Sequence, residues 1–280
     1  MIIPAKLKNK FCKRKYLPFV VTTLIVLSII ACCFYSSAVP PVMAQSAADS
    51  LPDVVMLQSG QRILIFSPHP DDETIGVGGY IARSTTAGAD VRIALVTDGN
   101  YHHNEPVRYS EFKQATQILG VPESNLLFLG LPDGKLDTLD KTTLSAALKA
   151  QIEQHNPDIV ICPSIKDDNP DHAMIGKTVE EILKADPHQR TVYEYLIHYK
   201  YIWPRPRELA PKIPLSPPIH LLNADSMWEK VPLSPAEENL KSEAIHTYRS
   251  QLENEWLKGL FLSSIRTNEL LIIPRNIYAK

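Results

Sequence analysis

Short apolar runs rich in β-branched and aromatic residues recur along the chain and alternate with segments whose apolar positions repeat every three or four residues. Runs of the first kind are typical of buried strands, and the longer spacing is typical of helices with one packed face. We expect strands at 62–66, 90–99 including its turn, 125–129, 158–162 and 191–198. Their alternation with helices predicts an α/β fold, in which a parallel sheet has helices on both faces in a three-layer arrangement.

The segments between these runs predict helices at 74–83, 109–119, 144–152 and 174–185. From 203 to 233 the chain is rich in proline, and we expect an irregular surface segment close to the functional site. Residues 234–237 then read Ser-Pro-Ala-Glu, which combines an N-cap, a proline at the first helical position and a capping box. The helix that starts there is expected to run towards Leu257, and 270–273 is a candidate for a closing strand.

The first fifty residues have a separate pattern. Six basic residues and no acidic ones precede residue 16, and 17–39 is uncharged and mostly apolar. A basic head before an apolar stretch is typical of a secretory signal or a single membrane anchor, and a buried core helix would not need it. Val42-Met43-Ala44 is a plausible cleavage site, and Ile29-Ile30-Ala31-Cys32 resembles a bacterial lipoprotein box with Cys32 as the lipidated residue. Each alternative predicts a membrane-anchored or exported protein.

Composition and charge narrow the class of the remaining chain. The sequence has 280 residues, of which 44% are hydrophobic and 21% are charged, as is usual for a globular protein. Without the six basic residues near the N-terminus, 23 basic residues face 31 acidic ones, a net charge near −8. A nucleic-acid partner would need a basic face, so we expect none. We divide the chain into a signal or anchor at 1–44, a linker at 45–60 and one α/β domain at 61–280.

The strongest indication of a reactive site lies between the first predicted strand and the first predicted helix. One histidine and three carboxylates lie together there, in the stretch Ser67-Pro68-His69-Pro70-Asp71-Asp72-Glu73. In an open α/β sheet such turns line the ligand crevice. His69 and Asp72 are close enough to share one metal ion, and a catalytic zinc takes three ligands of this kind and leaves a position for water. Asp71 would then lie within reach of that water as a base. The alternative is an acidic helix start in which Asp71 merely caps the helix.

A second histidine segment, Asp167-Asp168-Asn169-Pro170-Asp171-His172, follows the fourth predicted strand. His-Pro-Asp-Asp-Glu after the first strand and Pro-Asp-His after a later one resemble the PIG-L/LmbE family of zinc N-deacetylases. Supporting motifs extend the resemblance over roughly 63–251. They are Arg108-x-x-Glu111-x-x-x-Ala115-x-x-x-Leu119-Gly120, Phe128-Leu129-Gly130-x-Pro132-Asp133-Gly134, Tyr195-Leu196-Ile197-His198 and Lys241-x-x-Ala244-x-x-x-Tyr248-x-Ser250-Gln251.

The resemblance implies a Rossmann-like fold with Zn2+ as cofactor and the hydrolysis of N-acetyl groups, usually from an amino sugar such as N-acetylglucosamine. It implies that His69, Asp72 and His172 are the zinc ligands and that Asp71 is the catalytic base. The family often has His-Pro-Asp-His in the second segment, and its first histidine is thought to assist the oxyanion or the leaving amine. This chain has Asn169 at that position. An amide can donate a hydrogen bond to an oxyanion, but it cannot carry a proton.

Other polar residues are candidates for binding the substrate or supporting the metal. Arg108 could hold a polar substrate, or it could pair with Glu111 on the same helix. Asp133 lies in a Pro-Asp-Gly turn that turn chemistry alone explains, yet it also follows a strand, where substrate contact is expected. His198 follows a strand as well, and could be a hydrogen-bonded structural histidine. Asp171 is expected to orient His172 or its neighbours.

Three functions fit these residues. The first is a zinc deacetylase acting on an N-acetylated small molecule or glycan, with membrane association through its N-terminal segment. The second is a non-catalytic carbohydrate-binding relative, which Asn169 favours, whereas the intact set of His69, Asp71, Asp72 and His172 favours the first. The third is a zinc amidase or esterase for another acyl group, because a metal site recognises only a polarised carbonyl.

Overall fold

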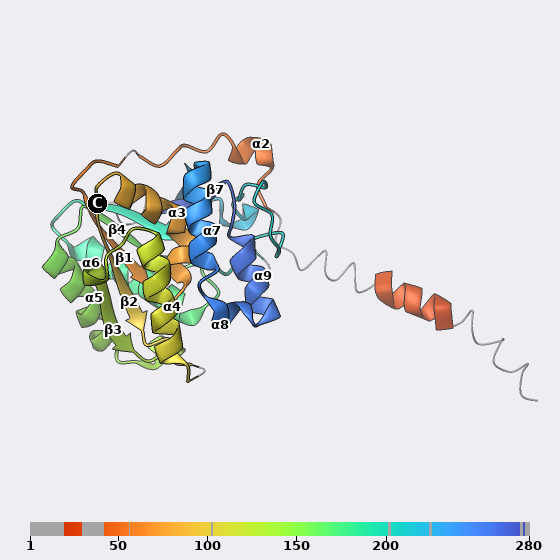
Figure 1. Ribbon diagram of the computed structural model, residues 1–280, viewed down its shortest axis with the longest axis horizontal. Helices are drawn as coiled ribbons and strands as arrows, with labels where there is room; N and C mark the ends of the chain where they lie inside the picture. The colour runs from red at the N-terminus through yellow and green to blue at the C-terminus, as the bar shows by residue number, and fades with distance from the viewer. Residues whose placement is uncertain are drawn as a thin grey trace, which may run out of the picture. The chain divides into compact units, whose positions relative to one another are not determined.

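Figure 1 shows the computed structural model of the chain. It describes residues 20–29, 42–55, 57–101, 103–200, 203–223, 226–274 and 277. The chain divides into two compact units, residues 1–40 and 41–280. In the first unit residues 20–29 are helical and exposed. Among the described residues, no helix combines the length and the apolar character that crossing a membrane requires. Most of the predicted signal or anchor, including Cys32, lies outside the described residues, so the placement of the protein stays a prediction.

The second unit is built on a sheet of seven strands in the order β3-β2-β1-β4-β5-β7-β6. The strands are β1 (Arg62–Ser67), β2 (Asp90–Thr97), β3 (Leu126–Leu131), β4 (Ile159–Pro163), β5 (Thr191–Tyr195), β6 (Ser226–Pro232) and β7 (Asn268–Pro274). The first five run parallel, as predicted. However, β7 is antiparallel to both β5 and β6, so the prediction of a wholly parallel sheet is wrong.

The two antiparallel strands form a long hairpin whose connection contains three helices. The backbone N–H of Leu233, just past β6, donates to the carbonyl of Thr267, just before β7, at 2.8 Å. The chain therefore leaves the end of β6 and returns to the same end to begin β7, which requires antiparallel pairing. The strand β6 itself was not predicted, because charged Glu229 and Lys230 interrupt its apolar positions.

The helices cover both faces of the sheet, which confirms that part of the α/β prediction. They are α2 (Gln45–Ala48), α3 (Asp72–Thr86), α4 (Glu105–Ile118), α5 (Lys141–His155), α6 (Pro170–Ala185), α7 (Pro235–Ile245), α8 (Arg249–Leu252) and α9 (Glu255–Ser263), with short 3-10 turns at Glu123–Asn125, Leu136–Thr138 and Ile219–Leu221. In Figure 1, α5 and α6 lie on one side of the sheet and α3, α4 and α7 on the other. Along β1, Ile63 and Ile65 join one buried cluster, and Leu64 and Phe66 join the other.

The single helix predicted from Ser234 towards Leu257 is wrong in its length. The predicted capping box is present, and it starts α7. That helix ends at Ile245, and the chain then turns to bury Tyr248 completely before the short α8. A new N-cap follows, because the Asn254 side chain accepts from the backbone N–H groups of Trp256 and Leu257 at 3.0 and 3.2 Å. The apolar spacing continued across both breaks, so periodicity alone could not reveal them.

Residues 42–55, which include most of the predicted linker at 45–60, pack beside β6 and Pro217. The backbone N–H of Met43 donates to the carbonyl of Pro217 at 2.8 Å, and Asp53 forms an isolated bridge with Lys230 of β6. The Lys230 ammonium group also donates to the carbonyls of Asp49 and Leu51, both at 2.6 Å. These contacts add a short extended segment beside β6.

Candidate metal-dependent active site

The predicted site residues meet at the edge of the sheet where the parallel strands end. The turn between β1 and α3 supplies His69, Asp71 and Asp72, and the start of α6, after β4, supplies His172. The loops after β3 and β5 contribute Asp133 and His198, and α4 contributes Arg108. Parallel strands bring their carboxyl ends to one edge, so residues far apart in sequence become neighbours there.

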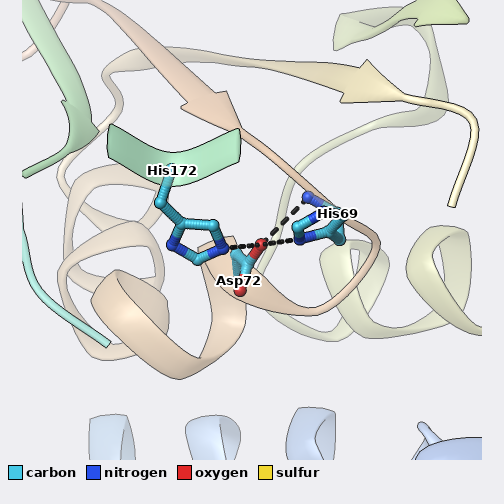
Figure 2. Close-up of side chains that lie close together, drawn as sticks. All are labelled: His69, Asp72 and His172. Atoms are coloured by element: carbon cyan, nitrogen blue, oxygen red, sulfur yellow. Dashed lines mark hydrogen bonds and ion pairs between the residues drawn. The ribbon is translucent and has the colours of Figure 1, made fainter. Parts of the chain in front are cut away.

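Asp72 lies between two histidines (Figure 2). Its Oδ2 atom is 3.0 Å from His69 Nδ1 and 3.0 Å from His172 Nε2. His172 is fully buried, and no group in the described part of the chain satisfies either of its ring nitrogens with good hydrogen-bond geometry. Buried ring nitrogens facing a carboxylate fit metal ligation, and two histidines with one aspartate are a donor set that catalytic zinc uses. The three predicted ligands therefore converge and fit a metal ion.

Further carboxylates hold the outer nitrogens of these histidines. His69 Nε2 lies 3.1 Å from Asp133 Oδ1 and 3.3 Å from Asp171 Oδ2. His172 Nδ1 lies 3.4 Å from Asp167 Oδ2. Carboxylates in this position fix the orientation of a ligand histidine and raise its basicity. The contact of Asp171 is thus with His69, and Asp167, which sequence reasoning missed, is the one beside His172.

Asp167 also connects His172 to the end of β5. Its Oδ2 atom accepts from the backbone N–H groups of Ile197 and His198 at 2.9 and 3.0 Å, and its Oδ1 atom lies 3.0 Å from His198 Nδ1. The rings of His172 and His198 meet edge to face, with centroids 4.9 Å apart. The only sequence signal for this role was the position of Asp167 shortly after a parallel strand.

The charges of the candidate ligands depend on one another. Burial alone would lower the pKa of His172, but the carboxylates of Asp72 and Asp167 raise it to about 9. Burial alone would raise the pKa of Asp72, but His172 and His69 hold it well below its usual range. The carboxylates around His69, Asp72 and His172 therefore stabilise positive charge at the centre of the cluster.

Asp71 occupies the N-cap position of α3 without capping it. Its φ angle is 139°, and its side chain makes no capping hydrogen bond, so the alternative of a simple helix cap is wrong. The carboxylate instead accepts from Arg108 Nη2 at 3.0 Å. Burial raises the pKa of Asp71 to about 8, and the Arg108 guanidinium acts in the opposite direction. This is the environment of a proton-exchanging group.

The Glu73 side chain stabilises the backbone of Asp71 in its positive-φ conformation. The Asp71 backbone N–H donates to Glu73 Oε2 at 3.3 Å, and that same oxygen accepts from the Ser67 hydroxyl at 3.0 Å. The other carboxylate oxygen accepts from Tyr248 at 2.6 Å and from Thr74 at 2.5 Å. Tyr248, far along the chain, thereby supports the turn that carries the candidate base.

Arg108 is placed by the backbone around the site. Its guanidinium donates to the carbonyls of Gly99 and Pro70, both at 3.1 Å, and its Nη1 atom lies 3.5 Å from Asp133. Glu111, the alternative partner, instead accepts from the backbone and side chain of Ser250. Arg108 thus joins Asp71 to Asp133 across the site.

Asn169 has a structural task in addition to its place at the site. It is the N-cap of α6, and its Oδ1 atom accepts from the backbone N–H of Asp171 at 2.9 Å. Because the oxygen must face this N–H, the NH2 group is the part of the amide that remains to donate. Asn169 therefore keeps the donor function that oxyanion stabilisation needs.

A pocket of about 350 Å³ contains the site. Its polar lining includes every predicted site residue except the fully buried His172, along with Asp171, Asp137, Tyr101 and Gln251. Its apolar lining includes Ile75 of α3 and three residues of α9, which are Leu257, Leu260 and Phe261. The apolar lining from α9 was not predicted, because its side chains carry no reactive group that a motif could reveal.

An α/β protein with a His-Asp-His donor set at the carboxyl edge of its parallel strands defines a class of candidate metal-dependent hydrolases. Residues 64–183 match the family model PIG-L, described as GlcNAc-PI de-N-acetylase. This part of the chain is therefore a PIG-L family domain, and the resemblance seen in the motifs is confirmed.

Two curated relatives are named as deacetylases. The chain is 28% identical over 157 residues to a probable N-acetyl-alpha-D-glucosaminyl L-malate deacetylase 2 of Bacillus anthracis, covering 51% of this chain and 68% of the relative. It is 31% identical over 128 residues to the diacetylchitobiose deacetylase of Thermococcus kodakarensis, covering 41% of this chain and 46% of the relative. The second match thus spans less than half of that relative's length.

A solved structure shares the fold. The N,N'-diacetylchitobiose deacetylase from Pyrococcus horikoshii aligns with a TM-score of 0.59 at 20% identity, over 78% of this chain and 86% of its own. At this identity the likeness concerns the fold alone.

Proposed function

We propose that this protein is a zinc-dependent hydrolase that removes the N-acetyl group from an amino sugar. The observation that carries the proposal is the convergence of His69, Asp72 and His172 on one point beside the buried carboxylate of Asp71. The PIG-L domain and the deacetylase relatives support an N-deacetylase over an esterase. Ligands of the His and Asp type favour zinc among the hydrolytic metals.

Zinc held by His69, Asp72 and His172 would polarise the amide carbonyl and make water nucleophilic at neutral pH. Asp71 accepts the proton of that water as its oxygen bonds to the carbonyl carbon. Arg108 fixes the Asp71 carboxylate and favours its ionised form. The Asn169 amide donates to the carbonyl oxygen as negative charge develops on it.

The same proton then completes the reaction. The C–N bond breaks, and Asp71 returns the proton to the leaving nitrogen, which yields acetate and a free amine. Asn169 cannot supply this proton, so Asp71 serves as both base and acid. The carboxylates of Asp133, Asp171 and Asp167 keep the two ligand histidines oriented throughout.

The test is metal content together with acetate release from a panel of N-acetylated amino sugars. We expect about one zinc ion per chain and measurable acetate release, with both lost in Asp72→Ala. Asp140→Ala is the matched control, because Asp140 caps α5 away from the pocket, with its carboxylate accepting from Thr142. A wild-type protein that binds zinc and sugar but releases no acetate would instead support a non-catalytic carbohydrate-binding relative.

A further inference from the structure

The pocket has two chemically different sides. Asp133, Asp137, Asn169 and His198 offer hydrogen-bonding groups from the loops that follow the parallel strands. Leu257, Leu260 and Phe261 of α9, which we call the α9 wall, offer only hydrocarbon. An acetyl group and a sugar do not by themselves require an apolar wall beside the reacting groups, so the α9 wall calls for a separate explanation.

The α9 wall is held in place by its own contacts. The Asn254 side chain caps the start of α9. The buried Arg266 donates through Nε to the carbonyl of Ser263 at the end of α9, at 2.7 Å, and through Nη2 to the carbonyl of Pro206 at 2.8 Å. Both ends of the helix are therefore fixed, and the wall is preorganised for a ligand.

Leu257 is the residue of the α9 wall whose exposed surface a ligand can bury. Leu260 and Phe261 are 2% and 1% exposed and form the base of the wall, whereas Leu257 is half-buried and lines the pocket. Ile75 continues the apolar surface on α3, and its backbone N–H donates to the carbonyl of Asp71 at 2.9 Å. The apolar surface thus begins one helical turn from the candidate base and ligand.

We propose that the α9 wall binds the acyl chain of the substrate and that the enzyme accepts N-acyl groups longer than acetyl. The inference rests on the proposed hydrolysis of an N-acyl amino sugar. The acyl chain is the apolar part of such a substrate, and the sugar hydroxyls match the polar side of the pocket. The wall also lies outside the PIG-L match at 64–183, so it is a feature of this chain's C-terminal part.

The test compares N-acetylglucosamine with N-butanoyl- and N-hexanoylglucosamine. Burying one methylene is worth about threefold to fourfold in affinity, so we expect kcat/KM for the hexanoyl substrate to exceed that for the acetyl substrate by about tenfold or more. Leu257→Asn should remove most of this ratio because it places a polar amide in the wall. Leu257→Trp should shorten the preferred chain by filling the space.

Leu262→Asn is the matched control, because Leu262 is half-buried on the same helix but does not line the pocket. Its hexanoyl-to-acetyl ratio should equal that of the wild type. A wild-type ratio at or below one would overturn the inference. So would equal ratios in the wild type and Leu257→Asn, or a gain from an alkyl group on the glycosidic oxygen instead of on the amide.

A binding measurement separates this inference from the proposed function. Calorimetric titration of the zinc-loaded Asp71→Asn protein with the same three compounds reports affinity without turnover. Tighter binding with chain length, lost in the Leu257→Asn background, supports the acyl site even if the wild type hydrolyses none of them. Hydrolysis of N-acetylglucosamine with no effect of chain length on binding would leave the proposed function standing and overturn the acyl site.

Discussion

The parallel half of the sheet and its antiparallel edge contribute differently to the candidate site. The parallel half, β1 to β5 with the helices and loops between them, supplies the candidate metal ligands, the candidate base and the residues that orient them. Within the described residues, the antiparallel edge, β6 and β7 with the intervening α7 to α9, contributes none of the groups that could hold a metal ion. It forms the α9 wall and, through Tyr248, supports the turn that carries the candidate base. Reactive groups and pocket shape thus come from different parts of the chain.

The comparison teaches that the two halves should respond differently to substitution. In the parallel half, the buried charges of the pocket face one another and a prospective metal ion. In the antiparallel half, buried charges connect elements of the fold. Lys241 of α7 and Glu269 of β7 are 2.6 Å apart and almost fully buried, and Glu269 also accepts from the backbone N–H groups of Gly79 and Tyr80 in α3. We therefore expect losses of activity in one half and losses of stability in the other.

Asp71→Asn should produce the largest effect on activity. The three ligands remain, so zinc content should be unchanged, whereas hydrolysis should fall by about 10²–10⁴-fold because the proton acceptor is gone. Stability should change little, because the amide has the same shape as the carboxyl group. The measurement is zinc content, rate and thermal unfolding on one preparation. Full activity with zinc retained would rule out Asp71 as the base.

Lys241→Met should instead reduce stability by about 3–5 kcal/mol, because it leaves the Glu269 carboxylate buried without its counter-ion. Urea unfolding would measure the loss. The double variant Lys241→Met with Glu269→Gln is the control, and it should be more stable than the single variant because no buried charge is left over. Equal stability of the single variant and the wild type would show that the ion pair does not hold α7 to β7.

Glu194 of β5 should make stability depend on pH. Burial and the neighbouring Glu180 raise its pKa to about 8, while the Ser164 hydroxyl and Lys166 act in the opposite direction. The folded protein therefore keeps a proton that the unfolded chain releases above its ordinary pKa. Stability should fall as pH rises from about 5 to 8, by at most about 1.4 kcal/mol per pH unit.

Glu194→Gln should make this slope shallower, as measured by urea unfolding at several pH values, and Asp71, whose pKa burial also raises to about 8, accounts for part of what remains. Glu181→Gln, an exposed position on α6 beside Glu180, should retain it. A slope in Glu194→Gln as steep as that of the wild type would show that Glu194 does not titrate in this range.

Asn169→His should have the smallest effect. Histidine can replace the amide donor and add a proton carrier, so activity should hold or rise, but the cap of α6 is lost at a cost of about 0.5–2 kcal/mol. Asn169→Asp is the complementary variant. It keeps the capping oxygen and removes the donor, so stability should hold while the rate falls. The reaction rates and unfolding midpoints of the two variants would separate the donor role of Asn169 from its capping role. Lower activity in both variants would contradict the inference that Asn169 acts at the site only as a hydrogen-bond donor.

The sequence predicted the parallel half of the fold well. Apolar runs located the first five strands. The inner strands β1, β2, β4 and β5 are buried along most of their length and carry mainly apolar residues, whereas the edge strand β3 is apolar in sequence although its residues are only partly buried. The antiparallel edge was harder, because β6 has charged Glu229 and Lys230 among its apolar positions. The breaks around α8 were invisible because Tyr248 and Leu252 continue the helical spacing.

The candidate site was also predicted only in part. His69, Asp72 and His172 could be predicted as neighbours because each follows a parallel strand and has a metal-binding side chain. The contact of Asp167 with His172, and of Asp171 with His69, depends on side-chain directions that spacing does not determine. Asn169 both caps α6 and lines the pocket. The sequence indicated only its place at the site, because its motif position suggested a substituted histidine and not a helix cap.

The segment at 42–55 has a consequence for how the protein behaves when shortened. The strand β6 is the last in the sheet. On its outer side, the backbone N–H of Val54 donates to the carbonyl of Lys230, and the backbone N–H of Lys230 donates to the carbonyl of Pro52, both at 2.9 Å. An uncovered strand of this kind offers free backbone groups to other molecules and promotes aggregation. Trimming the chain to begin after residue 55 would therefore leave the candidate site residues intact and still yield a protein prone to self-association.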